Sequence, residues 1–191
     1  ETYEPSSGSL VIDVGSNDGS LLRPFKIHGY KVLGIDPAKE LARSATKSGI
    51  ETLPDMLSYS LAKDIVAKYG KASVVTAFNA FAHADDLGDM AKSIQCMLKP
   101  DGIFIFEVQY LLDVIDKMLI GSIFHEHMSH HSLKPMKQFL ARHGMEIINV
   151  ERSPIQHGSL IGTVQLIGGK RQVNPSVKNL LELERERKLD Y

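Results

Sequence analysis

The stretch Leu10-Val11-Ile12-Asp13-Val14-Gly15-Ser16-Asn17-Asp18-Gly19 decides the fold of this chain. Its first five residues form a short apolar run with β-branched side chains, which favours a buried strand over a helix. The run stops at Gly15, and the residues that follow are typical of a tight turn before a helix that begins near Ser20. The sequence therefore predicts a strand–turn–helix unit at the start of an α/β domain.

Further apolar runs alternate with helical patterns along the next hundred residues. The expected strands are residues 31–35, 49–53, 73–78 and 103–106, and the expected helices are 38–47, 57–69 and 85–98. Strands that read as continuous apolar runs and alternate with helices are typical of a mostly parallel sheet covered on both faces. Residues 100–102 (Pro-Asp-Gly) are typical of a turn before the last of these strands.

The last third of the chain has a different pattern. A helical pattern at 135–143 precedes two longer alternating segments, at 145–150 and 159–167. Only residues 151–158 separate the two segments, which is too few for a helical crossover. We therefore expect an α/β sheet that ends in an antiparallel strand pair.

Composition excludes several classes of protein. Hydrophobic residues make up 43% of the 191 residues and charged residues 24%, as in ordinary globular domains. A net charge of −1 gives no electrostatic footprint for nucleic acid or an anionic membrane, and no apolar stretch reaches the length of a membrane span. The single cysteine, Cys96, cannot form an internal disulfide, which favours a reducing cytoplasm. The sequence does not indicate an oligomeric state.

The loop after the first strand lies where open parallel sheets bind ligands. A dinucleotide fingerprint would need glycines at 15, 17 and 20, but these positions hold Gly15, Asn17 and Ser20. Asp36 ends the second strand, 21 residues past Gly15, where a carboxylate can accept two hydrogen bonds from a ribose diol. Asp13 would repel phosphate and attract an ammonium group. A turn without any ligand is the alternative; otherwise a ligand with a ribose, an amino group and no phosphate fits best.

The pattern Asp13-x-Gly15-x-Asn17-x-Gly19, together with Ile35-Asp36-Pro37, resembles the motifs of class I S-adenosylmethionine-dependent methyltransferases. The resemblance implies S-adenosyl-L-methionine as cofactor. It also implies a Rossmann-like, seven-stranded, mostly parallel sheet with helices on both faces and an antiparallel strand pair at the C-terminal end. The implied cofactor-binding residues are Asp13, Gly15, Asn17, Asp18 and Gly19 in the loop, Asp36 and Pro37 at the ribose, Asp55 and Met56 at the adenine, and Asn79, Ala80 and Phe81 at the sulfonium and carboxylate.

Six of the eight histidines lie after residue 120, and residues 124–127 (Phe-His-Glu-His) stand out among them. A metal site is one interpretation, but no cysteine accompanies these histidines and no His-Glu-x-x-His motif is present. A structural role is a second interpretation, which we favour for His130, His131 and His143. A third is general acid–base catalysis by a histidine that a neighbouring carboxylate orients.

Segments 107–113, 124–129, 143–146 and 153–161 resemble successive motifs of the nucleotide-sugar C-methyltransferases, which methylate a deoxysugar at C-3. The resemblance runs from about residue 10 to residue 168. It implies no metal, a nucleotide-linked keto-sugar as substrate, His127 as the base that removes a proton next to a ketone, and Glu126 as its partner. The implied substrate-binding residues are His83, Gln109, Tyr110, Phe124, His125, His157 and Ser159.

Two positions depart from that family's pattern, because Phe124 stands where a tyrosine is usual and Ile161 where an arginine is usual. Family members also carry an N-terminal zinc-binding domain and a further C-terminal domain, and we expect neither here. We divide the chain into a tail or linker (1–9), a methyltransferase domain (10–170) and a last segment (171–191). The last segment is expected to form either a solvated helix or a linker to an absent domain.

Alternative functions stay open at this point. They are O- or N-methylation of another small molecule, cofactor binding without catalysis, and, least favoured, metal-dependent hydrolysis.

Overall fold

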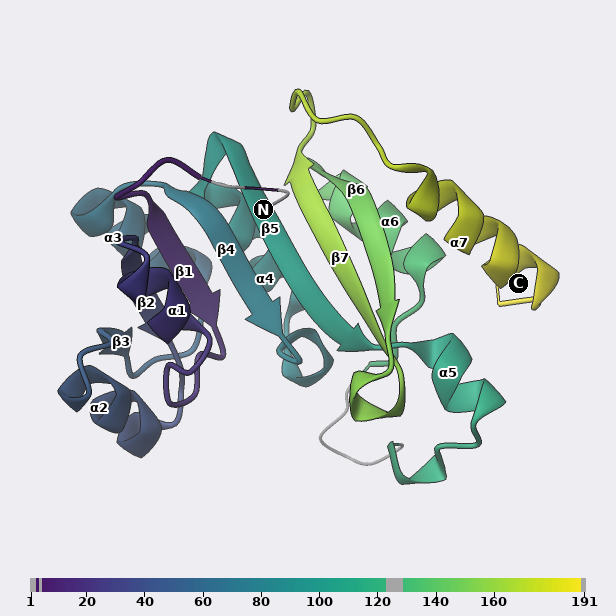
Figure 1. Cartoon of the computed structure of the whole chain (residues 1–191), viewed down its shortest axis with the longest axis horizontal. Coiled ribbons are helices and arrows are strands. Elements are labelled where there is room, and N and C mark those ends of the chain that lie inside the picture. Colours follow the sequence, from purple (N-terminus) through teal and green to yellow (C-terminus); the bar gives the residue numbers. More distant parts are fainter. Residues whose placement is uncertain (1–2, 4, 123–128, 190–191) are drawn as a thin grey trace.

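A computed structural model describes residues 3, 5–122 and 129–189 (Figure 1). The described residues form one seven-stranded sheet in the order β3-β2-β1-β4-β5-β7-β6. Its strands are β1 (Leu10–Val14), β2 (Lys31–Ile35), β3 (Thr52–Leu53), β4 (Ala72–Phe78), β5 (Leu98–Gln109), β6 (Met145–Ser153) and β7 (Ser159–Leu166). The strands from β3 to β5 pair parallel, whereas β7 pairs antiparallel with both β5 and β6. The predicted fold class is confirmed.

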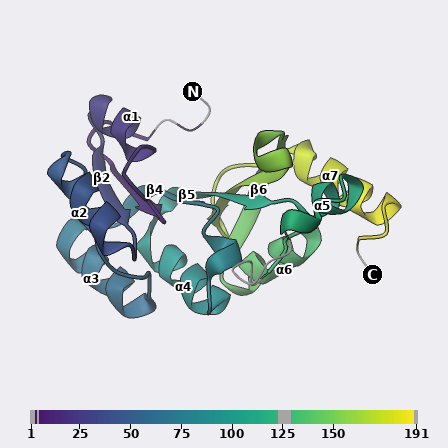
Figure 2. The same ribbon diagram turned by 90° about the horizontal axis from the view of Figure 1, so that it is seen from below.

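Helices cover both faces of the sheet (Figure 2). On one face, α1 (Leu22–Ile27) and α2 (Lys39–Lys47) bury side chains against β1 and β4. On the other face lie α3 (Tyr59–Tyr69), α4 (Leu87–Met97) and α6 (Leu133–Arg142), while α7 (Pro175–Glu186) packs against β6 and α6 at the end of the sheet. Short elements complete the chain: α5 (Leu111–Asp116) and the 3₁₀ turns η1 (Phe81–His83), η2 (Ile120–Ser122) and η3 (Ile155–His157). No helix in the described ranges is long and apolar enough to cross a membrane.

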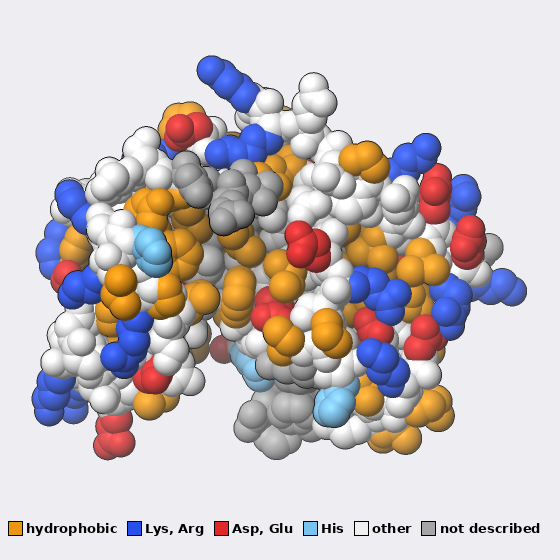
Figure 3. Space-filling view, viewed as in Figure 1, with side chains coloured by type: hydrophobic (Ala, Val, Ile, Leu, Met, Phe, Trp, Pro, Cys, Tyr) orange, Lys and Arg blue, Asp and Glu red, His pale blue; other side chains and the backbone are white. Residues whose placement is uncertain are grey.

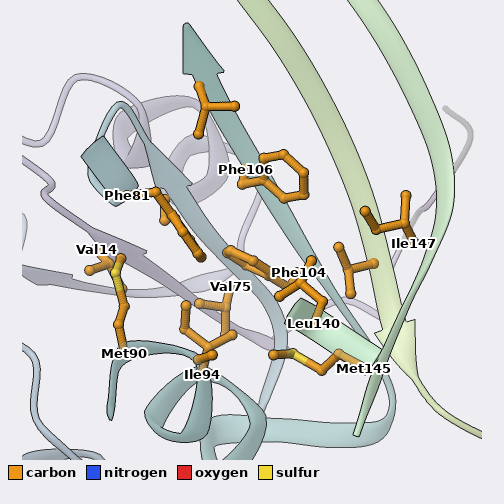
Figure 4. Packing of buried hydrophobic residues seen from close by; sticks show 14 of the residues in the cluster. Val14, Val75, Phe81, Met90, Ile94, Phe104, Phe106, Leu140, Met145 and Ile147 are labelled. Atoms are coloured by element: carbon orange, nitrogen blue, oxygen red, sulfur yellow. The ribbon is translucent and has the colours of Figure 1, made fainter. Parts of the chain in front are cut away.

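The larger core lies between the sheet and α3, α4 and α6, and aromatic rings fill its centre (Figure 4). The ring centroid of Phe81 lies 5.8 Å from that of Phe104 and 6.0 Å from that of Phe106. Gly162 pairs with Phe106 across β5 and β7, and a Cβ atom at this glycine would lie 2.2 Å from the Phe106 ring. A residue without a side chain is therefore required at position 162, because the ring occupies the space.

The structure differs from the sequence prediction around β5 in two ways. The predicted strand 103–106 is the middle of a longer strand, because β5 includes the expected turn at 100–102 as an irregularity. Ala72 pairs with Leu98 and Val74 with Ile103, so the additional residues bulge from the ladder while pairing continues on both sides. Helix α5, directly after β5, was not predicted.

The last helix is part of the same packed unit. One face of α7 buries Val177, Leu180 and Glu184, which are 2%, 8% and 0% exposed. A helix is present where the sequence predicts one; its apolar face belongs to the core that α6 and β6 share, and its other face is exposed.

Candidate functional site

The carboxyl ends of β1, β2 and β4 point to the bottom of Figure 1 and border a cavity of about 420 Å³. Strand β1 lies between β2 and β4, so the strand order reverses at this point, where open α/β sheets bind their ligands. The cavity is lined by eight residues that the sequence singled out: Gly15, Asp36, Pro37, Asp55, Met56, Asn79, Ala80 and His83. The structure thus brings together residues from four separate loops.

The loop after β1 is held against the end of β2 by its own backbone. The amides of Gly15 and Ser16 donate to the carbonyl oxygen of Ile35 at 2.8 and 3.2 Å. Gly15 has a φ of +76°, a left-handed conformation that favours glycine, and a Cβ atom there would lie 3.5 Å from that of Ala80. The loop therefore turns sharply and leaves its backbone close to the cavity.

Asp36 is the fixed polar group of the cavity. It is 7% exposed, and its Oδ2 accepts a hydrogen bond from the Asn17 amide at 2.7 Å while Oδ1 accepts one from the Ala38 amide at 2.8 Å. Each carboxylate oxygen has two lone pairs, so each keeps capacity for one further donor. Two vicinal hydroxyl groups of a ribose are such donors, and the residues present therefore fit the ribose of S-adenosylmethionine.

Asp13 lies beneath this loop and does not line the cavity. It is 3% exposed and accepts a hydrogen bond from the Thr76 hydroxyl at 2.6 Å. Burial raises the pKa of its carboxyl group to about 7; the Thr76 hydrogen bond opposes this shift and the charge of Asp36 adds to it. The sequence predicts a negative charge at the mouth of the cavity, and this prediction is wrong for Asp13. Its carboxyl group is buried, and a pKa of about 7 leaves it partly protonated near neutral pH.

Other predicted cofactor residues also lie away from the cavity lining. The carboxylate of Asp18 is exposed and accepts hydrogen bonds from the amide and hydroxyl of Ser20 at 3.0 and 2.5 Å, which hold its pKa below the usual range. Asn17 acts through its backbone amide, on Asp36. Gly19 has a φ of +78° and belongs to the turn that leads into α1. Phe81 is fully buried in the aromatic core, so its ring does not line the cavity.

Sequence reasoning missed part of the acidic character of the cavity. Five carboxylates line it, namely Asp36, Asp55, Asp85, Asp86 and Asp89, and the described lining residues include no lysine or arginine. Asp86 and Asp89 also accept backbone hydrogen bonds, from the amides of Asp89 and Tyr59 at 2.9 and 3.0 Å. Their sequence signal, an acidic run before a helix, indicated only the start of α4. This field attracts a cationic ligand and repels phosphate.

The predicted substrate residues at the ends of β5 and β7 divide into two groups. Gln109 pairs with Ser159 across the strands, and its Oε1 atom is buried without a hydrogen-bond partner among the described residues. His157 is exposed at the tip of the β6–β7 hairpin. Tyr110 and Ser159 are 0% exposed, and their hydroxyl groups donate to Glu184 at 2.9 Å and to Glu107 at 2.5 Å. Tyr110 and Ser159 are expected to bind substrate, but their hydroxyl groups already donate to the buried carboxylates of Glu184 and Glu107.

The expected catalytic segment, with Phe124, His125, Glu126 and His127, lies outside the described residues. The chain that follows it returns to the end of β5, where His131 forms a bridge with Tyr110 and its carbonyl oxygen accepts from the Leu111 amide at 2.9 Å. His131 is 9% exposed, its ring meets that of Phe81 edge-on at 6.3 Å, and burial, with a smaller effect of His130, lowers its pKa to about 4. A neutral, packed histidine agrees with the structural role expected for it.

Comparison with known proteins agrees with this geometry. Residues 3–150 match the model of a family described as a methyltransferase domain. The C-methyltransferase NovU of Streptomyces niveus is 32% identical over 94% of this chain and 43% of its own length. A ubiquinone biosynthesis O-methyltransferase of Bordetella bronchiseptica is 28% identical over 56% of this chain and 45% of its own length. The chain thus spans less than half the length of these curated relatives.

Among solved structures, a magnesium protoporphyrin IX methyltransferase (ChlM) from Synechocystis with bound SAH has a similar fold. Its TM-score is 0.62 at 19% identity, over 83% of this chain and 74% of that one. The family match covers most of the chain, and the cavity at the carboxyl ends of the strands contains a carboxylate, Asp36, that two backbone amides hold in place. The chain therefore belongs to the family of S-adenosylmethionine-dependent methyltransferase domains.

Proposed function

We propose that this chain is the catalytic domain of a C-methyltransferase whose substrate is a nucleotide-linked deoxysugar with a ketone. The observation that carries the methyltransferase part is the doubly anchored Asp36 carboxylate at the edge of an acidic cavity. A sulfonium cofactor bears a ribose diol and a positive charge and lacks phosphate. It therefore meets each demand of that cavity, whereas a phosphorylated dinucleotide does not.

Methylation at carbon needs a base. A carbon next to a ketone must lose its proton before the carbon can attack the methyl group, and donors near the oxygen stabilise the enolate that forms. We assign the base to His127 and its orientation to Glu126, on the resemblance of their segment to the nucleotide-sugar C-methyltransferases. The new carbon–carbon bond forms as the sulfur–methyl bond breaks, so S-adenosylhomocysteine leaves as the second product. In-line approach of carbon to methyl is largely a matter of positioning.

Gln109 supports a polar substrate. Its buried Oε1 lies at the end of β5, next to β4, and has no partner among the described residues; Asn79, which directly follows β4, lines the cofactor cavity. A buried carbonyl oxygen without a donor is unfavourable by about 1–3 kcal/mol, and a hydroxyl group of a bound sugar would satisfy it.

O-methylation is the second candidate, because ubiquinone biosynthesis O-methyltransferases also match the chain. We favour carbon as the acceptor because the C-methyltransferase matches 94% of the chain and the O-methyltransferase 56%. Two-dimensional NMR of a product made with ¹³C-methyl-labelled cofactor separates the two, because a methyl group on carbon and one on oxygen resonate in different ranges.

The first test is calorimetric titration of the chain with S-adenosylmethionine and, separately, with NAD. We expect saturable binding of S-adenosylmethionine, at least tenfold weaker binding by Asp36→Ala, and no binding of NAD. The control is Asp64→Ala, which removes an exposed carboxylate of α3 that does not line the cavity. Equal affinity of the Asp36→Ala variant and the parent, or binding of NAD alone, would contradict the cofactor assignment.

A further inference from the structure

Lys117 and Arg152 share one buried carboxylate, that of Asp113, near the predicted substrate residues at the ends of β5 and β7. Asp113 of α5 is 3% exposed, and its Oδ1 accepts hydrogen bonds from Lys117 Nζ at 3.0 Å and from Arg152 Nη2 at 2.9 Å. The side chains of Lys117 and Arg152 are 45% and 39% exposed. The cluster therefore carries a net charge of +1 and presents its two cations, and not its carboxylate, to the solvent.

Both cations are held in place by further contacts. Lys117 Nζ also donates to the carbonyl oxygen of His157 at 2.5 Å, and the Arg152 guanidinium lies 5.4 Å from the centroid of the Tyr110 ring. Burial acts to raise the pKa of Asp113, but the hydrogen bonds from Lys117 and Arg152 outweigh it and leave the pKa below its usual range. The carboxylate thus stays ionised near neutral pH and holds both cations.

The cluster lies at the same edge of the sheet as the cofactor cavity. The Tyr110 amide donates to the carbonyl oxygen of Gly158 at 3.2 Å, so α5 begins directly beside the β6–β7 hairpin (Figure 1). Figure 3 shows Lys, Arg, Asp and Glu side chains side by side over this end of the molecule. Strand β6, which carries Arg152, is three strands away from β4, or roughly 14 Å at a spacing of about 4.8 Å.

The distribution of charge favours cationic groups of a ligand in the cofactor cavity and anionic groups, such as phosphate, elsewhere on the molecule. Acidic side chains line the cofactor cavity, and the described lining contains no cation, so phosphate is disfavoured there. A separate cavity, which is basic and is lined by Lys26, Lys31 and Lys68, adjoins the amino ends of β1 and β2. It lies at the opposite edge of the sheet from the cofactor cavity. The Asp113 cluster combines half-exposed cations with a place at the carboxyl edge.

We propose that Arg152 and Lys117 bind the diphosphate of the nucleotide-linked substrate, with Asp113 as the residue that positions both. The proposal rests on the proposed function for the class of substrate. A guanidinium has five N–H donors and the bond to Asp113 uses one, so Arg152 can donate to two phosphate oxygens in its planar fork. Lys117 adds a second charge on the hairpin side. Gln109 lies at the end of β5, and β5 lies between β4, at the cofactor cavity, and the hairpin strands β7 and β6, the second of which carries Arg152.

The test is titration of the full chain, saturated with S-adenosylhomocysteine, with thymidine diphosphate, uridine diphosphate, inorganic pyrophosphate and thymidine. We expect both diphosphates and pyrophosphate to bind and thymidine not to bind, with affinity falling as salt rises. Arg152→Gln and Lys117→Gln each weaken binding about tenfold, as the loss of one charge-assisted hydrogen bond does. Arg152→Lys, which keeps the charge and loses the fork, falls between Arg152→Gln and the parent. The control is Lys178→Gln on α7, whose ammonium faces Glu182.

The outcomes separate this proposal from the one on which it rests. If the chain binds S-adenosylmethionine but none of the phosphate ligands, or binds them equally in the Arg152→Gln and Lys117→Gln variants, the diphosphate site is overturned and the cofactor site stands. If S-adenosylmethionine does not bind, the proposed function fails first. Circular dichroism of each variant shows whether it is folded, and Arg152→Lys supplies the comparison if Arg152→Gln is not.

Discussion

Glu184 of α7 accepts a hydrogen bond of 2.9 Å from the hydroxyl group of Tyr110, at the end of β5. The same carboxylate accepts from the amides of Leu133 and Lys134 at 2.5 and 2.9 Å, at the start of α6. Ser132, the N-cap residue of α6, makes no capping hydrogen bond through its side chain among the described residues. A side chain of α7 therefore supplies the cap that α6 lacks and fixes the end of β5 next to the expected substrate side.

We predict that Glu184→Ala lowers the free energy of unfolding by about 2–4 kcal/mol, because it removes the acceptor of the buried Tyr110 hydroxyl and of the buried Leu133 amide. Glu182→Ala on the same helix is the control, since its ion pair with Lys178 is exposed and contributes little. Urea denaturation measures both variants. Equal stabilities of the two would show that the carboxylate of Glu184 does not hold α6 and β5.

Gly162 gives a second prediction. An added Cβ would lie 2.2 Å from the Phe106 ring, and that ring is packed among other core aromatics, so Gly162→Ala forces a shift of core side chains. We expect a loss of about 1–3 kcal/mol in the free energy of unfolding. Gly121→Ala serves as control because no described atom lies within 4 Å of its added Cβ. Thermal denaturation that ranks the two alike would contradict the close approach.

The parallel half of the fold could be predicted because its signals are local. The run of β1 is buried throughout and that of β2 over its last three residues, and Asp36 directly follows β2. The bulge in β5 could not be predicted, because residues 100–102 have the composition of an ordinary turn. The strand continues only because Leu98 and Ile103, on either side of them, both pair with β4. Tertiary contact overrode local preference there.

The errors in the site have the same cause. Tyr110 was expected to meet substrate, but its partner Glu184 lies 74 residues away, which no spacing along the chain indicates. Phe81 follows two cavity residues directly, yet the 3₁₀ turn η1 directs its ring into the core. Sequence patterns thus located the cavity, whereas the direction of individual side chains depended on packing between distant segments.

The raised pKa of the Asp13 carboxyl group leads us to predict that the stability of the folded chain decreases as pH rises. Its pKa is about 7 in the folded protein and 3.8 as an ordinary aspartate, so between these values the folded chain holds a proton that the unfolded chain has released. Stability therefore falls as pH rises from about 4 to 7, by up to about 4 kcal/mol. Asp13→Asn, which stays neutral and can still accept from Thr76, should remove this component. Urea denaturation across that pH range checks the difference, and parallel curves for the variant and the parent would contradict it.

The lowered pKa of His131 leads us to predict the opposite dependence, in which stability decreases as pH falls. Burial, with a smaller effect of His130, lowers its pKa to about 4 from 6.5, so between these values the unfolded chain binds a proton that the folded chain refuses. Stability is therefore lost as pH falls from about 6.5 to 4, by about 3 kcal/mol. His131→Gln should flatten this part of the curve relative to the parent, while His28→Gln, at an exposed position, should leave it unchanged. If the His131→Gln variant kept the full loss of stability between pH 6.5 and 4, protonation of His131, which packs against Tyr110 and Phe81, would not be its cause.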